Sequence, residues 1–173
     1  MSDVIDKDIL DGFRQESTGL LEELVKIIDE VENTTDHFPS ELFQEFAGRI
    51  DRIMGAAKTI SMTAPDHEGL KRIGKLSELC KAVGYKASEQ KAIELLPIFA
   101  AFLNDTIEII HELMAAIEDE QKSSQIAGNF SGVLQKRLEW LSSRITGSGT
   151  APGSAKASEA ELKALAKRLG LST

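Results

Sequence analysis

Residues 40–60, SELFQEFAGRIDRIMGAAKTI, carry the clearest structural signal in the chain. Their apolar side chains recur every three or four positions, which is the spacing of one face of an α-helix rather than of a strand. Pro39 precedes the stretch and Pro65 follows it, so we expect the helix to start at residue 39 or 40 and to end near residue 62. The apolar positions are Leu42, Phe43, Phe46, Ile50, Ile53, Met54, Ala57 and Ile60.

The same spacing continues on both sides of this helix. It predicts further helices over residues 5–33, 66–84, 88–117 and 126–145. Asp66 is expected to cap the third helix and Gly84 to end it. Pro97 lies inside the fourth segment, which indicates either a kink or a new helix with Pro97 in its first turn. The fold predicted is all-α: an up-down antiparallel four-helix bundle with an additional C-terminal helix.

Composition divides the chain into four parts. Residues 1–122 form the bundle, and residues 123–146 form an additional helix that packs on it or extends it. Residues 147–157 are rich in Gly, Ser, Ala and Pro, as expected of a flexible linker. Residues 158–173 begin with a capping box and contain an apolar stripe of Leu162, Leu165 and Leu169. A helix this short is marginal alone in water, so we expect it to fold only against its own bundle or a partner.

Charge and composition exclude several classes of function. The 173 residues carry a formal net charge of -8, which would repel nucleic-acid phosphates and anionic lipid. No apolar run approaches the ~18 residues of a membrane span. The acidic start MSDVIDKDIL is unlike a signal peptide, so we expect a cytoplasmic protein without nucleic-acid or membrane partners. Cys80 is the single cysteine and is expected to lie in the core.

Motifs for catalysis or cofactor binding are missing. Neither GxGxxG nor GxxxxGK[ST] follows a strand pattern, which argues against nucleotide binding. His37, His67 and His111 lie on different predicted segments, without a second His or Cys at metal-ligand spacing. We therefore expect no cofactor, no metal and no catalytic residues.

One stretch resembles a known family. Residues 46–60, FAGRIDRIMGAAKTI, are similar to the phosphoacceptor helix of histidine phosphotransfer (HPt) domains, especially those of chemotaxis kinases, which reads roughly A-H-[ST]-[IL]-K-G-[GSA]-A-x-[TM]-[FIL]. Asp51 stands at the position of the phosphorylated histidine, and Met54 at that of the following lysine. The order of helices over residues 5–120 is also similar. The matching positions are Ile53, Gly55, Ala56, Ala57, Thr59 and Ile60.

This resemblance implies a degenerate HPt-like protein that binds a response-regulator receiver or a histidine kinase in bacterial two-component or chemotaxis-like signalling. Because Met54 supplies no cation, we expect an Asp51→His variant not to accept phosphate efficiently. The residues also fit a simpler interpretation, in which Gly55, Ala56 and Ala57 only let two helices pack closely. The implied partner-binding residues are Gly48, Asp51, Arg52, Met54, Gly55 and Lys58, with Leu162, Leu165 and Leu169 of the tail adding a second contact.

Two weaker similarities leave alternatives open. Residues 129–137 resemble the active helix of the chemotaxis phosphatase CheZ, which would imply hydrolysis of a receiver's acyl phosphate. Asn129 and Val133 occupy the functional positions, with Gln121 and Gln125 upstream. His111 begins an H-E-L string similar to that of sensor-kinase dimerisation helices, but no ATP-binding module follows. A third possibility is a structural bundle that forms homo-oligomers through its long first and fourth helices.

Overall fold

The computed structural model describes residues 5–147, and within this range it contains helices and no strands. The predicted all-α helical bundle is therefore confirmed. The predicted linker and tail helix, with Leu162, Leu165 and Leu169, lie outside the described residues. The helices are α1 Lys7–Asn33, α2 Ser40–Thr63, α3 Glu68–Ser88, the short 3₁₀ turn η1 Ile93–Leu95, α4 Leu96–Ala115 and α5 Glu120–Gly147.

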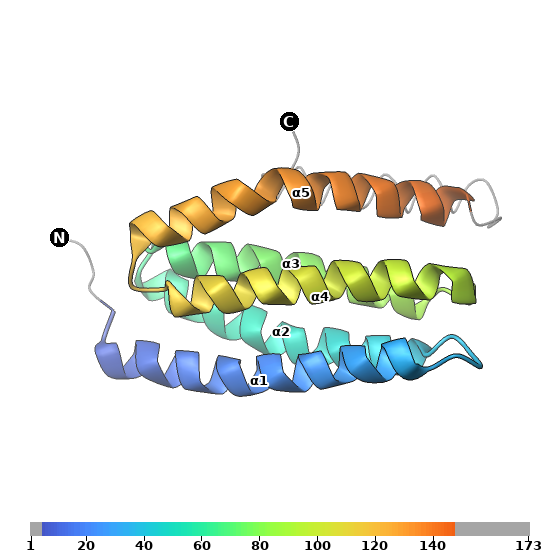
Figure 1. Ribbon diagram of the computed structural model, residues 1–173. Helices are drawn as coiled ribbons and strands as arrows, with labels where there is room; N and C mark the ends of the chain where they lie inside the picture. The colour runs from blue at the N-terminus through green and yellow to red at the C-terminus, as the bar shows by residue number, and fades with distance from the viewer. Residues whose placement is uncertain (1–4, 148–173) are drawn as a thin grey trace.

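The first four α-helices form a closed ring. Each contacts the next in the chain, and α4 returns to contact α1. The chain reverses at each connection, so neighbouring helices lie side by side along most of their length (Figure 1). The fifth helix lies outside the ring, against α4 and to a smaller extent against α3. It covers one side of the bundle.

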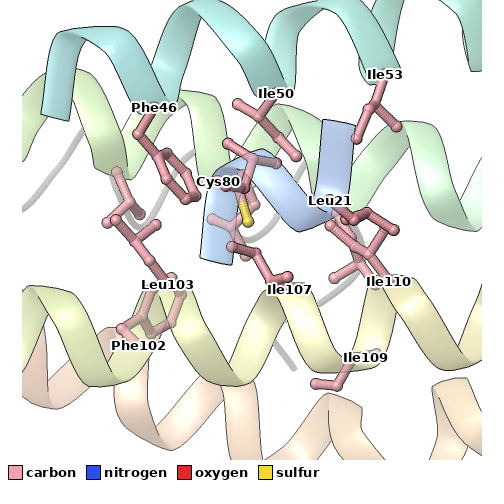
Figure 2. Packing of buried hydrophobic residues seen from close by; sticks show 14 of the residues in the cluster. Leu21, Phe46, Ile50, Ile53, Cys80, Phe102, Leu103, Ile107, Ile109 and Ile110 are labelled. Carbon is pink, nitrogen blue, oxygen red and sulfur yellow. The ribbon is translucent and has the colours of Figure 1, made fainter. Parts of the chain in front are cut away.

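A continuous apolar core fills the ring. Figure 2 shows side chains from α1, α2, α3 and α4 meeting there, including Leu21, Ile50 and Ile107. The ring of Phe43 stacks on Phe38 and meets Phe99 edge to face, with ring centroids 5.5 Å and 6.0 Å apart. Full burial of each large apolar side chain stabilises the fold by roughly 1.5–3 kcal/mol. Cys80 lies in this core with no exposed surface, as predicted.

Small residues make α2 and α3 the most extensive helix pair. A Cβ at Gly84 would lie 3.3 Å from the Cβ of Ala47, and one at Gly74 would lie 3.8 Å from the Cβ of Ala57. We call these four residues the α2–α3 seam. The prediction that Gly84 ends the third helix was wrong, because α3 continues to Ser88 and Gly84 serves close packing instead.

Several helix ends differ from the prediction. His67, not Asp66, caps α3, and its Nδ1 accepts a hydrogen bond from the Leu70 N–H at 3.1 Å. The fourth segment is a new helix with Pro97 in its first turn, which was one of the two expected arrangements. The fifth helix begins at Glu120 because the carboxylate of Asp119 accepts the Lys122 N–H at 3.0 Å. The predicted division between residues 122 and 123 therefore falls inside α5.

Candidate functional site

The two sides of α2 use small residues differently. Ala47 and Ala57 are buried in the α2–α3 seam. Gly48 and Gly55 are exposed, and a Cβ added to either would meet no atom within 4 Å. The close-packing interpretation therefore holds for Ala57 but not for Gly55. The outward side of the helix is a surface in which the backbone is open to approach.

Charged side chains lie between and beside these glycines. Asp51 is half-buried and Met54 is partly buried, whereas Arg52 and Lys58 are exposed. We call Gly48, Asp51, Arg52, Gly55 and Lys58 the α2 surface. The structure brings all five together on one helix, with Met54 at its edge.

Ion pairs fix the α2 surface to both neighbouring helices. Asp51 Oδ1 lies 2.8 Å from Lys81 Nζ of α3, and Lys58 Nζ lies 3.2 Å from Glu78 Oε2 of the same helix. On the opposite side, Arg52 Nη2 lies 2.9 Å from Glu16 Oε1 of α1. Because every one of these side chains keeps solvent-exposed surface, each pair contributes at most about 1 kcal/mol to stability. Their main effect is to fix the positions of the charged groups of α2 relative to α1 and α3.

Lys81 changes the expectation for position 51. Met54 itself supplies no cation there, because its side chain is a thioether. An ammonium from α3 lies beside the residue instead, with Lys81 Nζ 2.8 Å from Asp51 Oδ1. The hydrogen bond to Asp51 raises the pKa of Lys81 above its ordinary value, so the ammonium form is favoured there. The sequence analysis did not identify Lys81 because this residue lies thirty positions from Asp51. One signal was available in the sequence. Asp51 and Lys58 follow each other along α2, and their partners Lys81 and Glu78 follow in the reverse order along α3, as expected for antiparallel helices.

Asp51 combines a fixed orientation with an exposed carboxylate. A carboxylate at position 51 lacks the imidazole nitrogen that carries a phosphoryl group in the family that this helix resembles. The carboxylate keeps 46% of its side-chain surface exposed while it bonds to Lys81. It therefore presents a fixed, oriented charge between two open stretches of backbone.

The histidines have separate structural settings. His37 lies before α2 and its Nδ1 is 2.7 Å from Asp36 Oδ1, a hydrogen bond that lowers the pKa of Asp36. His67 caps α3, as described above, and His111 is exposed on α4. Among residues 5–147, no three His, Cys, Asp or Glu side chains are grouped so that they could hold a metal ion.

The residues of the phosphatase alternative lie on α5. Gln121, Gln125 and Asn129 are exposed there, and Val133 is 43% exposed. Val133 lines a small groove between α4 and α5, beside the ion pair of Arg137 with Asp105. This groove is lined partly by apolar side chains, and the three amides lie in a row along the exposed face of the helix.

Over residues 5–147, no helix combines the length and the apolar character needed to cross a membrane. Comparison of the chain with protein-family models, curated proteins and solved structures finds no match.

Proposed function

We propose that this chain is a non-catalytic, HPt-like protein that binds the receiver domain of a response regulator through the α2 surface. Its setting would be bacterial two-component or chemotaxis-like signalling. The observation that supports this proposal is the open backbone at Gly48 and Gly55, on either side of the ion-paired Asp51.

Gly48 and Gly55 leave open space on the α2 surface. Glycine inside a helix costs roughly 0.5–1 kcal/mol relative to alanine. Gly84 offsets that cost through close packing in the α2–α3 seam, but Gly48 and Gly55 have no neighbouring atom within reach of a Cβ. A partner that approaches the backbone closely would make use of the space they leave.

The charges of the α2 surface are held in place by ion pairs. Asp51 is negative and Arg52 and Lys58 are positive, and each is held by a partner on α1 or α3. Oriented charges of this kind select a partner and speed its association more than they add affinity. Without a histidine at position 51, such binding would not pass a phosphoryl group onward.

A binding experiment tests the proposal. Receiver domains encoded in the same genome would be titrated into the labelled full chain, each with and without beryllofluoride. At least one should bind, and Gly55→Arg should weaken that binding at least tenfold. Gly132→Arg is the matched control, because Gly132 is an exposed helical glycine of α5 with no atom within 4 Å of an added Cβ. Absence of binding to every receiver, or equal binding by Gly55→Arg, would contradict the proposal.

Phosphate release from the phosphorylated receiver separates binding from hydrolysis. Binding without faster release supports the docking function, whereas faster release that is lost in an Asn129→Ala variant supports the phosphatase alternative. The Asp51→His variant adds a probe of the surface itself. Because Met54 supplies no cation, this variant should not be labelled efficiently by phosphoramidate. Efficient labelling that decreases when Lys81→Met is added would contradict this expectation and show that Lys81 supplies the cation.

A further inference from the structure

A groove of about 360 Å³ lies between α1 and α4, and the α2 surface does not contribute to it. Leu21 of α1 and Ile107 of α4 lie at its base and are almost fully buried. Val25 of α1 lines it as well and is 40% exposed, although it is a large aliphatic side chain. The groove is therefore apolar at its base and open to solvent.

Carboxylates line both sides of this groove. Glu22 is exposed on α1, and Glu108 and Glu112 are exposed on α4. Among the side chains that the structure describes, no Lys or Arg forms an ion pair with any of these three. Glu108 accepts a long hydrogen bond from the Asn104 amide, at 3.5 Å, and His111 is the other titratable group of the lining. These carboxylates differ from the charges of the α2 surface, which ion pairs hold in place.

The length of the groove suits a short apolar stripe. Its lining extends over residues 21–25 of α1 and residues 107–112 of α4, which correspond to about 6 Å and about 7.5 Å of helix length. Two apolar side chains at positions i and i+4 of a bound helix would lie about 6 Å apart along its axis. A helix with two apolar side chains one turn apart therefore matches the groove in length.

The carboxylates specify the flanks of such a helix. At about 100° per residue, positions i+1 and i+3 lie on opposite sides of the stripe formed by i and i+4. Cations at both positions would face Glu22 on one side and Glu108 or Glu112 on the other. Charge complementarity therefore favours a helix with the pattern apolar-basic-x-basic-apolar.

The tail of this chain does not have that pattern. In a helix of residues 158–169, Glu159 and Glu161 would lie closest to the edges of the leucine stripe, and so would face the carboxylates of the groove. The net charge of -8 also opposes a second copy of the chain as the occupant. These charges favour a different, basic protein.

We propose that the groove between α1 and α4 binds a basic amphipathic helix of another protein, with two apolar side chains one turn apart and a Lys or Arg on either side of them. Binding would cover Val25 and give the carboxylates on both sides cationic partners. The proposal does not depend on the α2 surface or on any receiver.

Synthetic peptides test the pattern. The probe is a labelled alanine-based peptide with Leu-Lys-Ala-Lys-Leu at its centre, long enough to form a helix in water. The matched control has Lys-Leu-Ala-Leu-Lys at its centre, so its composition and charge are the same but its leucines lie on opposite sides of the helix. Fluorescence anisotropy with the full chain at low salt should show at least tenfold tighter binding of the probe. No binding of the probe, or equal binding of both peptides, would overturn the proposal.

A pair of valine variants locates the bound probe. Val25→Asn should weaken its binding at least fivefold, because the apolar side of the groove loses its exposed aliphatic group. Val133→Asn is the matched control, since Val133 is 43% exposed and lines the neighbouring groove between α4 and α5. Circular dichroism checks that both variants keep their helix content. An equal or larger effect of Val133→Asn would place the probe outside the groove between α1 and α4 and so refute the proposal.

Charge variants check the role of the carboxylates. Glu108→Lys with Glu112→Lys should weaken binding of the probe at least tenfold. Glu41→Lys with Glu94→Lys changes the net charge equally at exposed positions outside the groove and should change the affinity less than twofold. Equal effects of the two pairs would mean that the probe is attracted by the net charge of the chain alone, and the proposed site would then be wrong.

Discussion

Replacing Gly55 by alanine should stabilise the bundle, because an added methyl group meets open space there. Alanine favours the helix over glycine by about 0.8–1.0 kcal/mol. Gly48 has the same environment, and the two positions are about 10 Å apart along α2, so their effects should add. The double variant should therefore gain roughly 1.5–2 kcal/mol. For a chain of this size that corresponds to an increase in Tm of about 3–8 °C.

Urea unfolding followed by circular dichroism at 222 nm measures this gain. Gly84→Ala is the contrasting variant, since its methyl group would lie 3.3 Å from the Cβ of Ala47 and 3.4 Å from Phe46 Cδ1. Crowding in the α2–α3 seam should cancel the helix preference, so we expect little gain or a loss. If Gly55→Ala is destabilising, or if Gly84→Ala gains as much, the distinction between an open and a packed side of α2 is wrong.

Three further predictions concern the core and the charges. Phe99→Ala should destabilise the fold by about 3–5 kcal/mol, measured by urea unfolding, because the ring is fully buried; a cost below about 1 kcal/mol would contradict the core packing. The thiol of Cys80 should not react with a disulfide reagent in the native protein, because burial raises its pKa and excludes the reagent, and should react once urea is added. Asp51→Asn should cost less than about 1 kcal/mol at neutral pH. The pKa of Lys81 is higher in the folded state, so the ion pair stabilises the fold fully at a pH below the unfolded-state pKa. This stabilisation is lost as the pH rises through the folded-state pKa. The free energies of unfolding of wild type and variant, measured by urea titration, should therefore become equal at strongly alkaline pH.

The sequence predicted the helical elements well where the apolar periodicity and the helix-breaking prolines indicated the same bounds. The helix of residues 40–60 begins at Ser40 and ends at Thr63, close to the expected bounds. Gly84 misled the prediction because a glycine that ends a helix and one that lets two helices pack closely are identical in sequence. Only the position of Ala47 across the seam distinguishes them.

The candidate site was predicted in part. Gly48, Asp51 and Gly55 share the outward side of α2 because helical spacing alone decides which residues share a face. Lys81 could not be predicted in the same way, since its contact with Asp51 depends on how α3 is rotated against α2. That rotation follows from the packing of small residues in the seam, which local patterns do not specify.

Helix α5 lies outside the ring of four helices, so we expect it to unfold locally before the other helices do. Four helices close a ring without it, so α5 can separate while the ring keeps its core contacts, and its amides should exchange hydrogen fastest among the five α-helices. Amides of α2 and α3, joined by the largest contact in the bundle, should exchange last and only through global unfolding. We therefore expect the α2–α3 pair to exchange slowly and the outer helix α5 to open first.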